Sequence, residues 1–143
     1  MLVLTETWTR AEVAELNRFV FLFEDNLQGK GMSGQACIRG LSNAFGVPTK
    51  TALSTEPSAF FTDETYKWNV ERINHTLELL PNDGRTLVYH ANIGKSLTQL
   101  NVRAHKTYTY LLLRLSTFRD EELRHVSLPE LREMNTEWGI GNR

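Results

Sequence analysis

A glycine-rich segment, Gly29-Lys30-Gly31-Met32-Ser33-Gly34, matches the pattern G-x-G-x-x-G. Glycines let backbone N–H groups approach a ligand without interference from Cβ atoms. A helix that begins at the end of such a loop adds partial positive charge, and the ammonium group of Lys30 adds a full one. The segment therefore predicts a cradle for a phosphate or diphosphate, and the alternative is a glycine-rich turn that only reverses the chain.

The same segment does not fit a dinucleotide-dependent dehydrogenase. In those enzymes the glycine turn directly follows its strand, whereas here residues 24–28 lie between the apolar run and the first glycine. The acidic residue expected at the end of a following strand, about 20 positions on, is also missing. A chain of 143 residues leaves little room for both a dinucleotide half and a catalytic half.

A second polar loop, residues 91–97, follows the predicted strand 86–90, and Lys50 ends another predicted strand region. Loops that follow parallel strands emerge at the carboxyl edge of the sheet, where open α/β sheets bind ligands. We therefore expect both loops and Lys50 to face one cleft. The predicted ligand-binding residues are Asn26, Gly29, Lys30, Gly31, Ser33, Gly34, Gln35, Lys50, Asn92, Gly94, Lys95 and Ser96.

The sequence assigns no catalytic residue. Glu24 and Asp25 could act as a base on a bound water, or they are simply exposed loop residues. Cys37 has no histidine at a recognisable spacing, so we interpret it as a small buried hydrophobe. The four histidines stand at positions 75, 90, 105 and 125, without the spacing of a metal site. No metal and no cofactor are therefore expected.

Alternating apolar segments define the elements that must position these residues. The predicted strands are 2–4 (an edge strand), 19–23 (buried on both faces), 44–47 (ended by Pro48) and 86–90. The predicted helices are 10–17, 34–40, 63–80, 97–117 and 128–137. Capping boxes at Thr9 to Glu12 and at Ser127 to Glu130 mark the beginnings of the first and last helices.

This alternation predicts a three-layer α/β fold, with a mostly parallel or mixed sheet and helices on both faces. Residues 1–118 should form the domain, and 119–143 a charged segment and a short helix packed on it. The terminal helix has the regularly spaced apolar residues Leu128, Leu131, Met134 and Trp138, and it is expected either to pack back on the domain through the first three or to contact a partner. The predicted core contains Val20, Phe21, Phe23, Ile73, Leu77, Val88, Leu111 and Leu115.

The charge, the apolar runs and the cysteine count argue against several classes of function and location. The formal net charge is −1, which gives no general attraction to nucleic acid or to an anionic membrane. The longest apolar runs are too short to cross a bilayer. A single cysteine excludes an internal disulfide, and together these features favour a cytoplasmic protein.

The segment Asn26 to Ile38 resembles the first ligand loop of macrodomains, and residues 91–97 are similar to their diphosphate loop. Lys95 and Ser96 stand where that second loop normally continues with glycine. The sequence is also similar to small accessory proteins of T-even-type phages, through Asp25-Asn26-Leu27, Gly34-Gln35-Ala36 and residues 46–50. The first resemblance implies a macrodomain-like fold that binds ADP-ribose or a related nucleotide, and the second implies a location in the host cytoplasm without implying a reaction.

Three hypotheses follow from the sequence. The first is a macrodomain-like module that binds ADP-ribose or another nucleotide, with hydrolysis of a bond to that ligand left open. The second is a non-enzymatic accessory protein that binds a host protein and uses the α/β fold only as a scaffold. The third is a structural remnant without a ligand.

Overall fold

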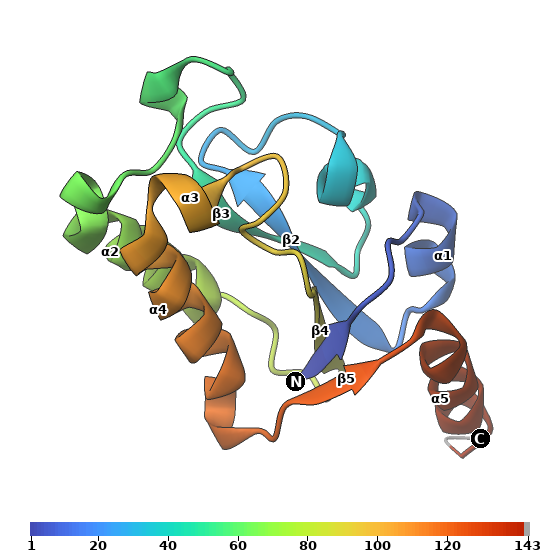
Figure 1. Ribbon diagram of the computed structural model, residues 1–143. Helices are drawn as coiled ribbons and strands as arrows, with labels where there is room; N and C mark the ends of the chain where they lie inside the picture. Colours follow the sequence, from blue (N-terminus) through green and yellow to red (C-terminus); the bar gives the residue numbers. More distant parts are fainter. Residues whose placement is uncertain (142–143) are drawn as a thin grey trace.

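The computed structural model describes residues 1–141, with side chains as far as residue 137. Its centre is a five-stranded, wholly parallel sheet in the order β3-β2-β4-β1-β5 (Figure 1). The strands are β1 (Leu2–Leu4), β2 (Phe19–Asn26), β3 (Ala44–Lys50), β4 (Thr86–His90) and β5 (Arg124–Val126). Because all five strands are parallel, their carboxyl ends lie at one edge, where the loops after β2 and β4 emerge.

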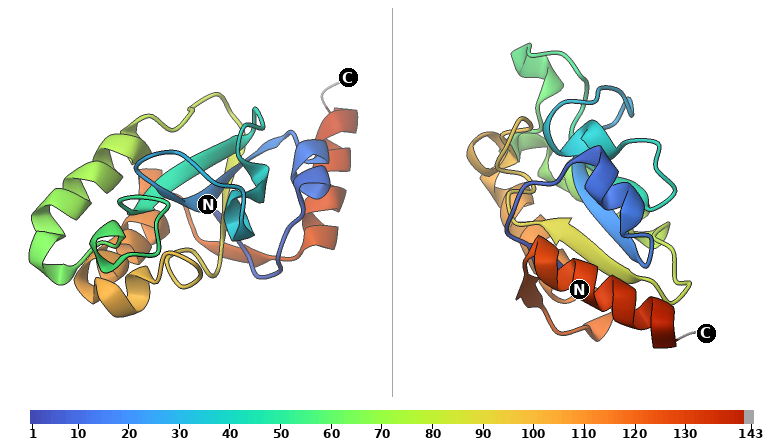
Figure 2. Two further views of the ribbon diagram at one scale, coloured as in Figure 1. Left: turned by 90° about the horizontal axis from the view of Figure 1, so that it is seen from above. Right: turned by 90° about the vertical axis from the view of Figure 1, so that its right-hand side faces the viewer.

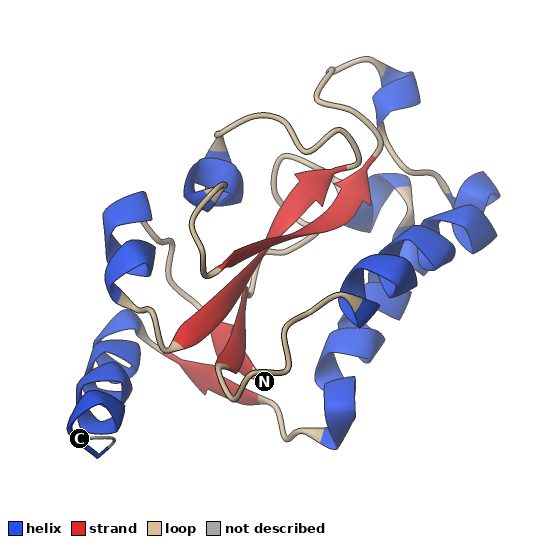
Figure 3. Cartoon of the chain, turned by 180° about the vertical axis from the view of Figure 1, so that it is seen from behind, coloured by secondary structure: helices blue, strands red, loops and turns tan. Residues whose placement is uncertain are grey.

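Helices cover both faces of the sheet, so the predicted three-layer α/β fold is confirmed (Figure 3). One face carries α2 (Tyr66–Glu78) and α4 (His105–Ser116), and the other carries α1 (Arg10–Glu15), the 3-10 helix η1 (Gly34–Ile38) and α5 (Leu128–Gly141). Alternate residues of β2 supply the two cores, with Val20 and Leu22 toward the first face and Phe19, Phe21 and Phe23 toward the second. All eight residues predicted to form the core are buried.

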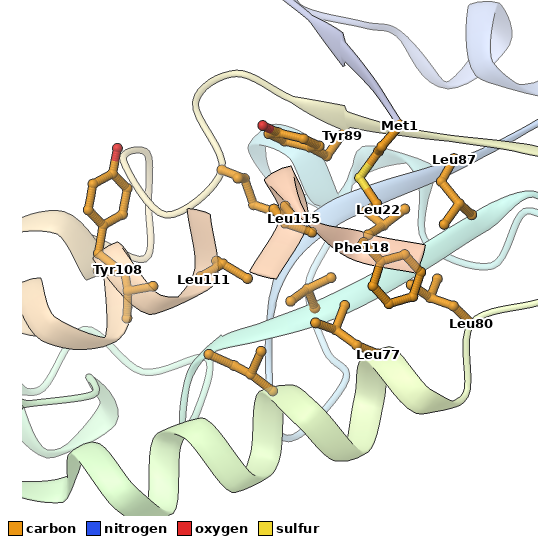
Figure 4. Close-up of a cluster of buried hydrophobic side chains, with 14 of the residues drawn as sticks. Met1, Leu22, Leu77, Leu80, Leu87, Tyr89, Tyr108, Leu111, Leu115 and Phe118 are labelled. Carbon is orange, nitrogen blue, oxygen red and sulfur yellow. The ribbon is translucent and has the colours of Figure 1, made fainter. Parts of the chain in front are cut away.

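A core of buried hydrophobic side chains lies between the sheet and the helices α2 and α4 (Figure 4). Leu77 of α2 and Leu111 and Leu115 of α4 pack toward Leu22 of the sheet, and each of these side chains is almost fully buried. Met1 joins the same cluster, and its ammonium group donates to the Glu121 carboxylate at 2.9 Å.

At the far side of the sheet one prediction was wrong and one strand was missed. The strand 2–4 is internal, because β5 pairs with it in parallel on the side away from β4. β5 had not been predicted, since it has three residues, two of them exposed, within a charge-dense segment. A strand this short and polar at a sheet edge leaves almost no hydrophobic pattern in the sequence.

The strands β2 and β3 both run further than their apolar residues suggested. β3 continues through Pro48 to Lys50 instead of ending before Pro48. It is the edge strand of the sheet, where the missing N–H of a proline costs no ladder hydrogen bond. β2 continues through Glu24 and Asp25 to Asn26, so the polar residues expected in a loop are held at the end of a strand.

Three helices differ from the predicted ones. The helix expected over 34–40 is the short 3-10 helix η1, which is too short to add a useful helix dipole. The helix expected over 63–80 begins with the 3-10 helix η3 (Asp63–Thr65) and continues as α2. The helix expected over 97–117 is divided into α3 (Leu100–Arg103) and α4, because Gln99 is left-handed and Ala104 is non-helical.

The C-terminal helix packs back on the domain, which is the first of the two predicted alternatives. Leu128 and Leu131 are buried in the second core and Met134 packs against it; the side chain of Trp138 lies outside the described residues. Figure 2 shows α5 beside α1, and Arg132 pairs there with Glu12 at 2.7 Å. Both predicted capping boxes are present, at Thr9 with Glu12 and at Ser127 with Glu130.

Candidate functional site

The side chain of Asn26 holds the glycine-rich loop in shape. Its Oδ1 accepts the backbone N–H groups of Gln28 at 3.0 Å and Lys30 at 3.4 Å, while its Nδ2 donates to the Lys30 carbonyl at 2.8 Å. Gly31 has a φ of +96°, and a Cβ there would lie 2.7 Å from Leu53 Cδ1. Asn26 therefore acts on the loop itself, and its predicted contact with a ligand stays a prediction.

A half-buried ion pair closes the base of the same loop. Arg39 makes a two-pronged contact with the Asp25 carboxylate, and its Nε donates to the Gly31 carbonyl at 2.8 Å. A bidentate guanidinium–carboxylate pair fixes both side chains. Asp25 is thus paired with a cation and serves to hold the loop.

Glu24 joins the two predicted ligand loops. Its carboxylate is buried at the end of β2 and accepts the backbone N–H groups of Gly94 at 2.9 Å, Thr98 at 3.3 Å and Ser96 at 3.4 Å. Burial raises the pKa of Glu24, and these backbone hydrogen bonds oppose that rise. Because the N–H groups of residues 96 and 98 point to a carboxylate, the chain forms a loop there and helix α3 begins only at residue 100.

A pocket of about 430 Å³ lies between the two loops and the segment that follows β3. We call it the cation pocket, because it is lined by four cationic side chains, of which Arg39 alone has an ion-pair partner among the described residues. Its lining residues are Glu24, Asp25, Asn26, Lys30, Gly31, Ser33, Ala36, Arg39, Lys50, Leu53, Thr55, Phe60, Ser96, Leu97, Thr98, Gln99 and Arg103.

Lys50 and Arg103 meet on the ring of Phe60 in this pocket. The Lys50 ammonium lies 4.4 Å from the ring centroid and the Arg103 guanidinium 3.8 Å. Lys50 is only 8% exposed, and its ammonium has the Leu53 carbonyl at 3.5 Å as a hydrogen-bond acceptor. Burial lowers the pKa of Lys50, the positive charge of Arg103 lowers it further, and the Glu24 carboxylate partly opposes both.

A smaller pocket of about 220 Å³ lies on the other side of the 91–97 loop. We call it the Trp8 pocket, and its lining residues are Thr7, Trp8, Gly34, Gln35, His90, Asn92 and Ser96. None of these side chains carries a formal charge when His90 is neutral, and burial lowers the pKa of His90, with the Glu6 backbone opposing this by less.

Nine of the twelve predicted ligand residues line one or both of these pockets. Asn26, Lys30, Gly31, Ser33 and Lys50 line the cation pocket, Gly34, Gln35 and Asn92 line the Trp8 pocket, and Ser96 lines both. The two loops thus share a cleft, while ligand binding at it stays a prediction.

Three predicted residues line neither pocket. Gly29 lines a separate depression beside Gly46 and Pro48. Gly94 donates to Glu24, and a Cβ there would lie 3.1 Å from Tyr108. The ammonium group of Lys95 lies 6.0 Å from the Tyr108 ring centroid, where it faces the α4 side of the loop.

Several pocket residues were not predicted from the sequence. Arg39, Phe60 and Arg103 line the cation pocket, while Trp8 and His90 line the other. A signal existed for His90, because it ends a predicted strand at the ligand edge of the sheet. The sequence contained no such signal for Arg103. This residue ends the short helix α3, whereas the hydrophobic pattern predicted one continuous helix over 97–117.

The sequence candidates for catalysis have structural partners. Glu24 and Asp25 bind the backbone N–H groups and Arg39 described above. Burial raises the pKa of the Cys37 thiol, and its Sγ lies 3.9 Å from the Trp8 carbonyl, as suits a packed side chain. Among residues 1–137 no group of three or more His, Cys, Asp or Glu side chains is placed to hold a metal ion.

No helix in the described part of the chain is long and apolar enough to span a membrane. Comparison with curated proteins and with solved structures gave no match. Residues 3–114 match a family described as a family of unknown function, DUF7831. This match spans both loops, both pockets and most of the sheet, and the chain therefore belongs to that family.

Proposed function

We propose that the protein is a small-ligand binding module whose cation pocket takes an anionic group, with a nucleotide or ADP-ribose-like molecule as the ligand class. The observation that carries the proposal is the meeting of Lys50 and Arg103 on one phenyl ring inside a pocket. Neither cation forms an ion pair with any described side chain.

Two neighbouring cations without a counterion repel each other, and the burial of Lys50 removes part of the solvent that would screen its charge, whereas Arg103 is exposed. A phosphate or carboxylate between Lys50 and Arg103 would offset the repulsion between the two cations and give the Lys50 ammonium a counterion. Lys30, at the mouth of the same pocket, adds a third positive charge. The volume of about 430 Å³ lies within the usual range for small-molecule sites.

We propose binding rather than a reaction, because both carboxylates in the pocket are already engaged in hydrogen bonds or an ion pair within the protein. Glu24 accepts three backbone N–H groups, and Asp25 is paired with Arg39. A general base needs a lone pair directed at the proton that it removes. In this arrangement the two carboxylates shape the loops, and the cations Lys30, Lys50 and Arg103 are left for the ligand.

A second candidate function is the binding of a protein partner, such as a host protein if the likeness to phage accessory proteins reflects common ancestry. The observation in its favour is the rim of the cation pocket. Leu53 and Leu97 line this pocket, and each is more than half exposed. Neighbouring exposed apolar side chains on a folded protein can mark a protein-interaction site.

A thermal-shift and calorimetric screen distinguishes the two functions. We expect pyrophosphate, ADP-ribose and simple nucleotides to raise the melting temperature, because a ligand that binds only the folded state stabilises it. Added salt should weaken this effect by screening. If no phosphate compound binds below millimolar concentration, the nucleotide proposal is wrong and the protein-partner function takes its place.

A further inference from the structure

The Trp8 pocket contains two buried hydrogen-bond donors that have no partner. Gln35 Nε2 and His90 Nε2 are shielded from solvent, and neither makes a hydrogen bond with the described residues, although the Glu6 backbone lies close enough to the His90 ring to raise its pKa slightly against the effect of burial. Their side chains are 7% and 3% exposed, and both line the pocket. Buried polar groups are nearly always paired in folded proteins, so two orphans in one pocket indicate a missing acceptor.

The surrounding hydrogen bonds fix both groups as donors. Gln35 Oε1 accepts the Glu24 backbone N–H at 3.0 Å, which orients the amide and leaves its NH₂ group unpaired. His90 Nδ1 accepts the Asn92 backbone N–H at 2.9 Å, so the proton of the neutral ring is on Nε2. A ligand that pairs with both donors must therefore present two hydrogen-bond acceptors.

The pocket is also rigid and aromatic. Trp8 Nε1 donates to the Gln35 carbonyl at 3.1 Å, and the Trp8 ring meets the His90 ring edge-on with centroids 5.3 Å apart. A fixed indole beside two fixed donors suits a flat, uncharged, hydrogen-bonding ring. A free anion is less suited, because none of the lining side chains carries a positive charge.

The Trp8 pocket lies next to the cation pocket. Ser96 lines both, and the division between them is the contact of Leu97 with Gly34, where a Cβ would lie 3.1 Å from Leu97 Cδ1. An uncharged polar pocket beside a cationic one matches a molecule with a neutral ring at one end and a phosphate at the other.

We propose that the Trp8 pocket binds the nucleobase of a nucleotide whose phosphate occupies the cation pocket, and that it selects a base with two adjacent acceptors. Guanine presents O6 and N7 as neighbouring acceptors, whereas adenine presents a donor amino group beside N7. The inference rests on the proposed function, and it adds a preference for guanine over adenine that is set by Gln35 and His90.

Calorimetric titration with guanosine monophosphate, adenosine monophosphate and ribose 5-phosphate tests this proposal. For the unmodified protein we expect guanosine monophosphate to bind about tenfold more tightly than the other two, as two added hydrogen bonds would give. His90→Asn keeps an acceptor near the Asn92 N–H and removes the Nε2 donor. Gln35→Glu keeps the acceptor for the Glu24 N–H and replaces the donor with an oxygen.

Both variants should lose the guanine preference while ribose 5-phosphate binds as before. Equal affinities for the three ligands in the unmodified protein would overturn the base pocket and leave the phosphate site standing. A guanine preference that survives both variants would overturn its assignment to these residues. Absence of binding by all three would overturn the proposed function as well.

A second measurement covers the case in which a variant does not fold. In the unmodified protein, the side-chain ¹⁵N–¹H signals of Gln35 and His90 should shift on addition of guanosine monophosphate but not of ribose 5-phosphate. Signals that stay unchanged at a saturating concentration of guanosine monophosphate would contradict the proposal.

Discussion

The carboxylate of Glu24 accepts the backbone N–H of Gly94 at 2.9 Å, across 70 residues of sequence. This bond, with those from Ser96 and Thr98, ties the end of β2 to the loop after β4. The relative position of the two pockets therefore depends on one buried side chain, and Glu24 organises the site without being free to contact a ligand.

Glu24→Ala should destabilise the protein by about 3 kcal/mol, because up to three backbone donors lose a charged acceptor. The amides of residues 94, 96 and 98 should exchange with solvent faster than in the unmodified protein. Urea denaturation and hydrogen exchange measure the two effects. Glu71→Ala is the matched control, since Glu71 is exposed on α2 and should change stability little. A Glu24 variant as stable as this control would contradict the role assigned to Glu24.

The sequence predicted the layers of this fold because its strands and its long helices bury regular apolar patterns. The 19–23 run and the spacing of Ile73 and Leu77 each indicate one face and one element type. β5 could not be predicted, because a three-residue edge strand takes its stability from pairing with β1 and carries no pattern of its own.

The candidate site was predictable only where it follows strand ends. Asn26, Lys50 and Asn92 were found by topology, since parallel strands bring their carboxyl ends together. The role of Asn26 was not readable, because whether an amide binds the loop or a ligand depends on backbone positions that only the fold fixes. The break of the predicted 97–117 helix was not readable either, because it lies in the backbone angles of Gln99 and Ala104, on either side of the short helix that carries Arg103.

Asn26→Ala should loosen the glycine-rich loop and thereby weaken ligand binding. The loss of its three hydrogen bonds frees the backbone around Lys30, so a ligand would have to order the loop on binding. We expect a several-fold weaker affinity in calorimetry, together with faster amide exchange at residues 28–31. Asn26→Asp keeps the acceptor and should have a smaller effect on amide exchange. An Asn26→Ala variant with faster exchange and unchanged affinity would show that the loop takes no part in binding.

His90 should make stability depend on pH. Burial lowers its folded pKa below the ordinary value of 6.5, so at slightly acidic pH the unfolded chain binds a proton that the folded protein does not. The free energy of unfolding should therefore fall as the pH decreases through 6.5 toward the lower, folded pKa. Urea denaturation between about pH 5 and pH 8 should show this slope, with His90→Asn as the comparison. Identical slopes in the two proteins would mean that His90 does not titrate as described.

The C-terminal helix should contribute to the stability of the domain. Leu131 is fully buried against the second core, so Leu131→Ala should cost about 2–5 kcal/mol. Leu113→Ala is the control, because Leu113 is 59% exposed on α4. Deletion of residues 126–143 should lower the melting temperature further. If the deleted protein melts at the temperature of the full chain, the packing of α5 contributes nothing measurable.

The central claim is that Lys50 and Arg103 form an anion site, and calorimetric titration of charge variants with pyrophosphate tests it most directly. Lys50→Met and Arg103→Gln each remove one positive charge from the cation pocket, whereas Lys95→Gln removes one from the same edge of the protein but outside the pocket. We predict that each pocket variant weakens binding about tenfold or more, in line with the strength of charged hydrogen bonds, and that Lys95→Gln binds like the unmodified protein. Equal affinity in all four proteins, or an equal loss in all three variants, would contradict the account.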